Sequence, residues 1–422
     1  MTTNLLVIII LASVAFLNAV VYLIFPNMRK YTAIFARILI GLVFMFSGFV
    51  KAVDPLGSEY KIHDYLSSFG MTWLLPASLV FAILLNLAEF LIGFVVFFGI
   101  RMRLFSWGTL LFMVFFTPLT LYLAIKNPVS DCGCFGDFII FTNWETFFKN
   151  LVFITFAIIV FVHRKRFYDR MIPNWIKNLI ITIGVFIGIG IQLYAVRNDA
   201  IFDFRPWKVG NRIADMVIPT PEKSEILLIY KNLTTNAEEE FTSQTLPWED
   251  TVRMANLEFK EQRKKIIEQY KEAPIHDFII SDFVGDNYTD EYINKPEYHF
   301  ILFAYDLSKT NKKSFEKIND FAKKCSLDTV SFIAITGPTP NELNDFIKEV
   351  KPNFEFFSAD PTALKTVIRS NPGILLLKDG YIIDKWAHRD LPTYDEYKQN
   401  ISNYDSDYKK YTEKSKKITI TK

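Results

Sequence analysis

The chain has 422 residues, of which 50% are hydrophobic and 22% are charged, and its formal net charge at pH 7 is +2. A charge so close to zero, without a basic tract, predicts no nucleic-acid partner. A mean hydropathy of +0.18 beside that charged fraction means that apolar and charged residues are segregated along the chain. The division falls near Arg197, with apolar runs before it and ordinary charged sequence after it.

The part before Arg197 contains six apolar runs that are long enough to cross a membrane as helices. We expect the first helix, within residues 1–30, to be retained rather than cleaved, because no positive charge precedes it and no small-residue cleavage site follows it. The fifth run is the weakest, since Lys149 interrupts it, although a lysine near a span end can extend to the interface. The expected spans are Asn4–Phe25, Tyr31–Val50, Met71–Ile100, Leu104–Ile125, Phe141–Val162 and Lys177–Val196.

Basic residues in the loops predict the orientation of these spans. They gather in alternate loops, after the first, third and fifth spans: Arg29 and Lys30, Arg101 and Arg103, and Arg164, Lys165, Arg166 and Arg170. Because cytoplasmic loops carry an excess of Lys and Arg, both termini are expected on the exterior side. This predicts a multi-pass protein of the cell inner membrane with a periplasmic C-terminal part. The loop between the fourth and fifth spans would share that compartment, in which disulfides persist.

Two ionisable residues lie within the expected spans, Arg37 in the second and Glu89 in the third. An intramembrane carboxylate is costly unless it is paired or lined by water, so both residues are functional candidates. A Glu89–Arg37 ion pair would reduce the cost of both. The alternatives are that Arg37 extends to the cytoplasmic interface and that Glu89 is a protonated packing residue. A transporter with Glu89 as proton relay is disfavoured, because only one acidic residue lies deep in a span. The following loop, Lys51–Gly70, predicts a turn and an amphipathic helix at the outer interface.

Two of the three cysteines, Cys132 and Cys134, lie one residue apart between the fourth and fifth spans. Such a pair can close into a tight disulfide, and strained or exposed disulfides are the reactive ones. A metal site would need four ligands, and neither a second cysteine pair nor a histidine cluster accompanies this one, so no metal is predicted. The pattern favours a redox dithiol over inert thiols. The neighbouring Asp131 and Asp137 are expected to raise the pKa of the thiols.

The membrane half resembles the MauE branch of the DoxX family over about residues 31–166, which form a four-helix bundle in that family. The resemblance rests on Arg37-x-x-x-Gly41, Ser47–Pro55, the span with Glu89, and Cys132-Gly133-Cys134-Phe135-Gly136. The first span and the sixth, within 167–197, are additions. MauE proteins are implicated in maturing a periplasmic enzyme whose small subunit is dense in disulfides, so the resemblance implies disulfide handling. By analogy with other four-helix disulfide-forming membrane proteins, a quinone would accept the electrons.

Residues 198–273 are expected to form an exterior connector, with a strand at Glu225–Tyr230 and a solvated helix at Thr251–Lys271. Residues 274–422 then alternate strands and helices before a hairpin, which is a thioredoxin-type layout. The expected elements there are a strand and turn in Pro274–Asp286, strands at Tyr298–Ala304, Thr329–Ile335, Asn371–Leu377 and Tyr381–Trp386, and helices at Lys312–Lys324, Asn341–Val350 and Thr362–Ile368.

Over about Pro274–Tyr397 this part resembles the periplasmic TlpA-like thioredoxin branch, most clearly in Asn371-Pro372-Gly373 before a strand. The resemblance implies that Pro372 is cis and that Asn371, Pro372 and Gly373 bind a partner. It also implies a Cys-x-x-Cys after the strand that ends at Phe303.

Ser308 and Asn311 stand at or near those cysteine positions. Neither can form a disulfide, so the exterior α/β domain is expected to be a degenerate thioredoxin-like domain. Cys325 lies late in the following helix and is expected to be a buried apolar residue rather than a nucleophile.

The sequence therefore predicts a six-span membrane bundle with an exterior domain that handles thiols and disulfides during maturation of envelope proteins. Cys132 and Cys134 would exchange with an envelope client, and the exterior domain would dock it, beside the lipid bilayer. The alternative is a non-catalytic membrane scaffold whose cysteine pair only pins a loop. The missing Cys-x-x-Cys favours the scaffold, whereas the shared side of the dithiol and the domain favours redox chemistry.

Overall fold

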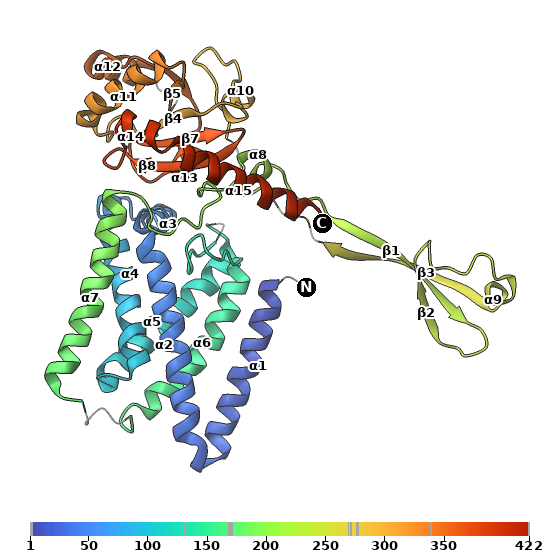
Figure 1. Ribbon diagram of the computed structural model, residues 1–422. Coiled ribbons are helices and arrows are strands. Elements are labelled where there is room, and N and C mark those ends of the chain that lie inside the picture. The colour runs from blue at the N-terminus through green and yellow to red at the C-terminus, as the bar shows by residue number, and fades with distance from the viewer. Residues whose placement is uncertain are drawn as a thin grey trace.

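The computed structural model describes residues 3–129, 131–167, 172–268, 270, 272–275, 278–337 and 340–420. It contains a bundle of long helices, an α/β domain seated on one end of the bundle, and a β-stranded arm that projects to the side (Figure 1).

Six helices are long and apolar enough to cross a membrane, as the sequence predicts. At 1.5 Å per residue each spans the roughly 30 Å of a bilayer's hydrocarbon core. They are α1 (Thr3–Ile24), α2 (Arg29–Val53), α4 (Ser78–Phe98), α5 (Met102–Lys126), α6 (Asn143–His163) and α7 (Asn174–Arg197). The amphipathic helix expected between α2 and α4 is also present, as α3 (Pro55–Ser68). Short 3-10 turns at Pro26–Met28 (η1) and Thr72–Ala77 (η2) complete the membrane part.

Glycines bring α2 and α4 into the closest backbone contact of the bundle. A Cβ added to Gly48 would lie 2.3 Å from the backbone N of Phe90, and one added to Gly93 would lie 2.1 Å from the backbone N of Met45. Small residues of this kind allow membrane helices to approach one another closely. Because the two helices run antiparallel, the last turn of α2 lies beside the middle of α4.

The loop that carries the cysteine pair, residues 127–142 (the cysteine loop), lies at the same end of the bundle as the α/β domain (Figure 1). We call this the cysteine end. The described basic residues of the three predicted cytoplasmic loops lie at the opposite, basic end; Arg170 is outside the described residues. The predicted shared side of the dithiol and the C-terminal domain is therefore confirmed.

The α/β domain is built on a five-stranded sheet of order β6-β5-β4-β7-β8. Its three parallel strands are β4, β5 and β6, and β7 runs antiparallel to both β4 and β8. The strands are β4 (His299–Ala304), β5 (Ser331–Thr336), β6 (Glu355–Ser358), β7 (Gly373–Lys378) and β8 (Tyr381–Ala387). The sequence predicts four of these; β6 is too short to stand out.

Helices cover both faces of this sheet, which explains why β4 is a continuous apolar run. Phe300 and Leu302 face one cluster, and Ile301 and Phe303 face the other. The first cluster is completed by α11 (Phe315–Leu327), α12 (Pro340–Val350) and α14 (Tyr394–Gln399), and the second by α13 (Pro361–Val367). The remaining short elements are α8 (Ile213–Met216), α10 (Thr289–Ile293) and η3 (Lys312–Ser314), and α15 (Ile401–Ile420) ends the described chain.

The connector after α7 is built into the domain rather than hanging free. The backbone N of Gly210 donates to Ile382 O at 2.8 Å, and the backbone N of Ile382 donates to Asn211 O at 3.0 Å. Trp207 is buried in the second apolar cluster. The connector therefore joins the sixth span to the edge strand β8.

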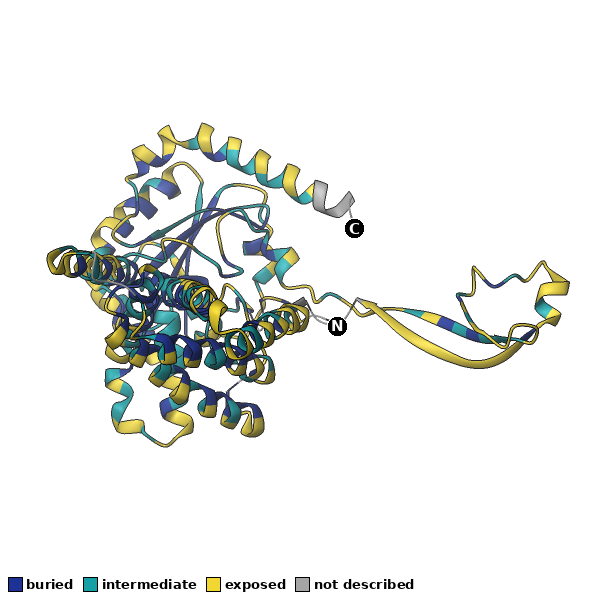
Figure 2. Cartoon of the chain, turned by 90° about the horizontal axis from the view of Figure 1, so that it is seen from below, coloured by how far each residue is buried: buried dark blue, intermediate teal, exposed yellow. Residues whose placement is uncertain are grey.

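The arm differs from its prediction. It is a three-stranded antiparallel sheet of order β2-β1-β3, with β1 (Lys223–Asn232), β2 (Glu238–Phe241) and β3 (Leu257–Glu268). The helix expected over Thr251–Lys271 is wrong: a single turn, α9 (Thr251–Ala255), precedes β3. Pairing with β1 decides this, since Tyr230 and Phe259 are cross-strand partners with ring centroids 5.5 Å apart. Figure 2 shows much of the arm as exposed, with a buried and half-buried stretch in one strand, and Ile229, Phe241 and Leu257 are buried.

The strand expected within Pro274–Asp286 is likewise not formed over the described residues of that segment. Only isolated bridges of Ser281 with Asn287 and with Ser358 occur there, and residues 276–277 lie outside the description.

Candidate functional site

Cys132 and Cys134 lie with their sulfur atoms 3.1 Å apart. This separation is longer than a disulfide bond, and both are free thiols that are half-buried at the cysteine end. Between them Gly133 has a φ of +66°, a backbone conformation that glycine adopts without cost. Its backbone N donates to Asp131 Oδ1 at 2.9 Å, which closes the turn. The loop thus presents both sulfurs on one side.

Side chains from two helices hold the backbone of this turn. Ser47 of α2 donates its hydroxyl to Cys134 O at 2.6 Å, and Tyr65 of α3 donates to Cys132 O at 2.9 Å. Lys61 of α3 forms an ion pair of 2.5 Å with Asp131. The dithiol is therefore placed by the rigid elements of the bundle, although it lies in a loop.

Glu89 does not pair with Arg37, which corrects the prediction. Its carboxylate forms an ion pair with Lys51, and both side chains are largely buried. Fourteen residues separate Arg37 from Lys51 on α2, which is about 20 Å at 1.5 Å per residue. The Arg37 guanidinium instead lies at the basic end, 5.7 Å from the ring centroid of Phe167.

Lys149 of α6 is turned inward toward the cysteine loop. Its ammonium lies 4.7 Å from the ring centroid of Phe135 and 5.6 Å from that of Phe141, and the residue is 6% exposed. Among the described residues, no carboxylate forms an ion pair with it. The residue that weakens the fifth span in the sequence is thus part of the wall around the dithiol.

The surroundings shift the pKa values of the two thiols in opposite directions. The hydrogen bond between the sulfurs, followed by the positive charges of Lys149 and Lys51, lowers the pKa of the Cys134 thiol to about 6, against the effect of burial. The same hydrogen bond, together with burial, raises the pKa of Cys132. One thiolate and one thiol are therefore the favoured state near neutral pH.

The prediction that Asp131 and Asp137 raise the pKa of the thiols is thus wrong for Cys134. Asp131 pairs with Lys61, and Asp137 lies 3.6 Å from the Arg369 guanidinium, so both negative charges are offset. The sequence could not supply these partners, because Arg369 comes from the distant α/β domain.

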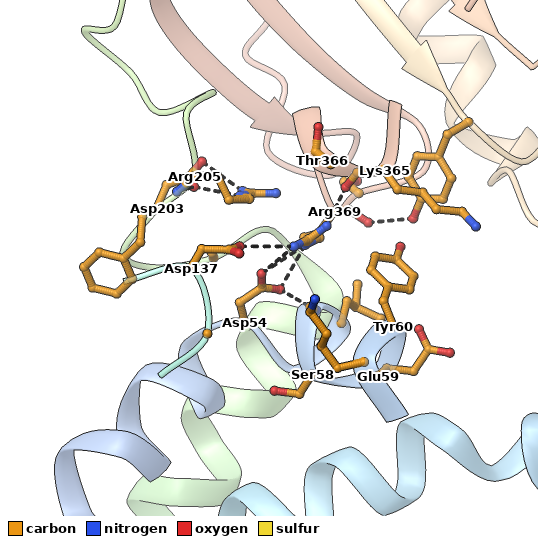
Figure 3. Close-up of a pocket in the computed structure, with 18 of the residues that line it drawn as sticks. Asp54, Ser58, Glu59, Tyr60, Asp137, Asp203, Arg205, Lys365, Thr366 and Arg369 are labelled. Carbon is orange, nitrogen blue, oxygen red and sulfur yellow. Dashed lines mark hydrogen bonds and ion pairs between the residues drawn. The ribbon is translucent and has the colours of Figure 1, made fainter. Parts of the chain in front are cut away.

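Arg369 is the main contact between the α/β domain and the bundle (Figure 3). Its Nε and Nη2 donate to the Asp54 carboxylate at 3.0 and 2.8 Å, and its side chain is 6% exposed. Although burial alone would raise the pKa of Asp54, the guanidinium holds it below its usual range. Tyr305 donates to Arg369 O at 2.9 Å, and the Tyr60 ring lies 5.2 Å from the guanidinium.

A second charged cluster fixes the connector to the same interface. Arg205 pairs with Asp203 at 2.7 Å and with Asp199 at 3.0 Å, and Lys385 of β8 pairs with Asp203 at 2.7 Å. All four side chains are largely buried. Two buried networks thus hold the domain in one position above the dithiol.

The loop after β4 carries the two degenerate positions. Ser308 donates its hydroxyl to Asp306 Oδ1 at 2.5 Å, and the Asn311 amide lies 3.1 Å from His388 Nε2. The backbone N of Asn311 donates to Asn371 O at 3.1 Å. The Asn371–Pro372 bond is cis, as predicted, and precedes Gly373 at the start of β7. These residues gather around one polar turn without a thiol.

Cys325 is fully buried in the apolar core of the domain, as expected. Burial raises the pKa of its thiol. It therefore belongs to the packing of α11 against the sheet rather than to a reactive site.

A cavity of about 1270 Å³ lies between the bundle and the domain. Its lining includes Gly133 and Asp137 from the cysteine loop, and Asn311 and Asn371 from the domain. The cysteine loop and the degenerate loop therefore border the same cavity, although neither Cys132 nor Cys134 is among the residues that line it. Its lining mixes charged side chains such as Lys61 and Arg389 with apolar ones such as Phe202 and Ile140.

Three of the residues that build the site follow helical spacing. Ser47, Lys51 and Asp54 occupy positions i, i+4 and i+7 at the end of an apolar span, and this polar stripe is a readable signal. Arg369, which follows α13, carries no comparable signal. Nothing in the neighbouring sequence distinguishes it from the other arginines of the chain.

Residues 29–163 match the family described as Methylamine utilisation protein MauE. The membrane segment is MauE-like. The match covers about a third of the chain and contains Lys51, Glu89, Lys149 and both loop cysteines. The arm and the α/β domain lie outside it. No curated protein and no solved structure matches the chain.

Proposed function

We propose that this protein exchanges disulfides with the thiols of envelope proteins at the periplasmic face of the inner membrane. Cys132 and Cys134 are the exchanging dithiol. The observation that carries the proposal is the placement of two free sulfurs 3.1 Å apart, near Lys149 and Lys51, in a loop whose Gly133 and Asp137 line the cavity. The basic residues at the opposite end of the bundle support a periplasmic position for that cavity.

The exchange moves two electrons between one dithiol and one disulfide. The Cys134 thiolate attacks a sulfur of a client disulfide, a mixed disulfide forms, and the client's other sulfur leaves as a thiolate. Cys132 then attacks Cys134, the mixed disulfide breaks, and the client leaves as a dithiol. Each step is reversible, so the same residues can also oxidise a client dithiol.

The α/β domain is the docking element in this proposal. Its order of parallel and antiparallel strands supports a thioredoxin-like frame. We infer that Asn371, Pro372 and Gly373 hold an extended client segment in the cavity, since backbone groups of a fixed loop can bind a peptide without a cysteine. Ser308 and Asn311 add no redox chemistry.

A quinone as the electron acceptor stays a prediction. The described residues supply no observation that places such a cofactor near the cysteine loop. No step is assigned to such a cofactor.

Trapping of mixed disulfides in cells tests the proposal. The Cys134→Ser and Cys132→Ser variants should each lose the internal disulfide, and at least one should accumulate a covalent adduct with an envelope protein that a reductant releases. Cys325→Ala, which removes the buried core thiol, should trap nothing and is the matched control.

The second candidate is a membrane scaffold without redox chemistry. The hydrogen bonds that fix the cysteine turn through Ser47 and Tyr65 favour it, because a structural loop needs them as much as a reactive one does. If both single cysteine variants trap nothing and match the wild type in envelope phenotype, the scaffold replaces the exchange reaction.

A further inference from the structure

Lys149 is a buried cation near the dithiol that takes part in no step of the exchange reaction described above. It lies in the second turn of α6, on the inner side of the bundle, and is 6% exposed. A lysine this close to a span end could extend its ammonium to the membrane interface. Instead the ammonium lies over the rings of Phe135 and Phe141, both in the cysteine loop.

Lys51 and Lys149 differ in whether a carboxylate neutralises the ammonium. Both are buried lysines next to the dithiol, but the ammonium of Lys51 is neutralised by Glu89. Within the described residues Lys149 has aromatic faces around it and no carboxylate partner. A buried charge without a counter-ion is strongly unfavourable, and aromatic rings offset only part of that cost.

The sulfur atoms supply the missing negative charge. Cys134 packs in the same cluster as Phe135 and Phe141, the two rings beside the Lys149 ammonium, and the Lys149 charge favours the ionised form of both thiols. The other charged and titratable groups that face the dithiol are already engaged with one another: Lys51 with Glu89, Lys61 with Asp131, and Tyr65 with Cys132 O. A thiolate at Cys134 is thus the natural partner of Lys149.

We propose that Lys149 is the counter-ion of the Cys134 thiolate and makes the Cys132–Cys134 disulfide a donor of disulfides. The inference rests on the proposed exchange function and gives it a direction. A residue that stabilises the thiolate stabilises the reduced protein, because a disulfide carries no charge for Lys149 to pair with. Stabilising the reduced form makes the disulfide more oxidising. Lys149 acts through the Cys134 sulfur and is a positioning residue.

The overall reaction balances with a client dithiol as the co-reactant. The Cys132–Cys134 bond breaks and accepts two electrons, and a client disulfide bond forms. Of the two client protons, one ends on the Cys132 sulfur and the other passes to water in the cavity. The Cys134 sulfur remains a thiolate beside Lys149.

Two measurements on the purified full-length protein test this. The first is the pH profile of thiol alkylation in the reduced protein, which should show a group near pH 6 in the wild type. The second is the equilibrium with reduced and oxidised glutathione. Lys149→Met should move the alkylation profile to higher pH and should shift the equilibrium at least tenfold toward the disulfide, or about 30 mV.

Lys149→Arg keeps the charge and should remain close to the wild type in both measurements. Lys177→Met removes another buried lysine from a span at the basic end and should change neither. If Lys149→Met does not fold, Lys149→Gln provides the same loss of charge with a side chain of similar length.

A neutral variant that stays within twofold of the wild type in both measurements would overturn the inference. Trapping by the cysteine variants would then still support the exchange function. The reverse pattern, a shifted equilibrium without trapping of any client, would keep Lys149 as the counter-ion and remove the client reaction.

Discussion

The cysteine loop of the bundle and the loop after β4 in the α/β domain face the same cavity, and both occupy positions where thiol chemistry is expected from sequence. The first has two thiols with lysines behind them. The second has Ser308 and Asn311, which are satisfied by Asp306 and His388. In the proposed function, the reactive part and the docking part thus lie in two regions of the chain, and an interface holds them together.

That interface depends first on the packing of the bundle. Gly93→Ala should produce the largest loss of stability within the bundle itself, because its Cβ would lie 2.1 Å from the backbone N of Met45 and would force α2 away from α4. Overpacking of this kind costs about 1–3 kcal/mol or more. Thermal unfolding in detergent measures the loss. Gly190→Ala, on a helix where nothing lies within 4 Å of the new Cβ, is the control and should leave the midpoint unchanged.

Removal of the buried arginine at the interface should separate the two regions without unfolding either. Arg369→Ala leaves Asp54 without its partner, and loss of one member of a buried pair costs about 3–5 kcal/mol. Hydrogen exchange should then rise in α3 and in the connector, and trapping of clients should fall. Arg389→Ala, an exposed arginine on the same cavity, should be neutral. Equal effects of both variants would argue against a specific role of the Arg369–Asp54 ion pair in holding the domain on the bundle.

The pH dependence of stability should differ between the reduced and oxidised forms. The pKa of Cys134 is lowered from its ordinary value near 9 to about 6 in the folded protein. Its stabilising effect is therefore complete above pH 9, is lost progressively as the pH falls toward 6, and is absent below that. Unfolding midpoints at pH 5.5 and pH 7.5, measured with and without reductant, should show a larger rise for the reduced protein. Cys134→Ser should abolish that difference.

The smallest effect is expected in the degenerate loop. Ser308 is exposed and bonds only to Asp306 among the described residues, so Ser308→Ala should change stability by less than about 0.5 kcal/mol. Client trapping should also be unchanged. A strong loss of trapping in this variant would mean that the loop takes part in the chemistry, and the separation of roles would fail.

Much of the architecture follows from sequence alone. Six apolar runs of span length determine the bundle, because the cost of burying charge in lipid leaves few alternatives. The alternation of basic loops predicts its orientation. The alternating strands and helices after Tyr298 are equally legible, since buried strands such as β4 are continuous apolar runs. The positions of the dithiol and of Ser308 and Asn311 can be read directly from the sequence, from their place relative to the predicted spans and strands.

The partners of the charged residues were decided only by the tertiary structure. Sequence placed Glu89 and Arg37 within neighbouring spans, but the depth at which helices meet depends on glycine contacts such as Gly93 on Met45, and these bring Lys51 to Glu89 instead. The segment of β3 is rich in charged residues, and it forms a strand because its backbone pairs with that of β1. Asp54 and Arg369 lie 315 positions apart, and the local sequence of neither segment predicts that folding brings them together.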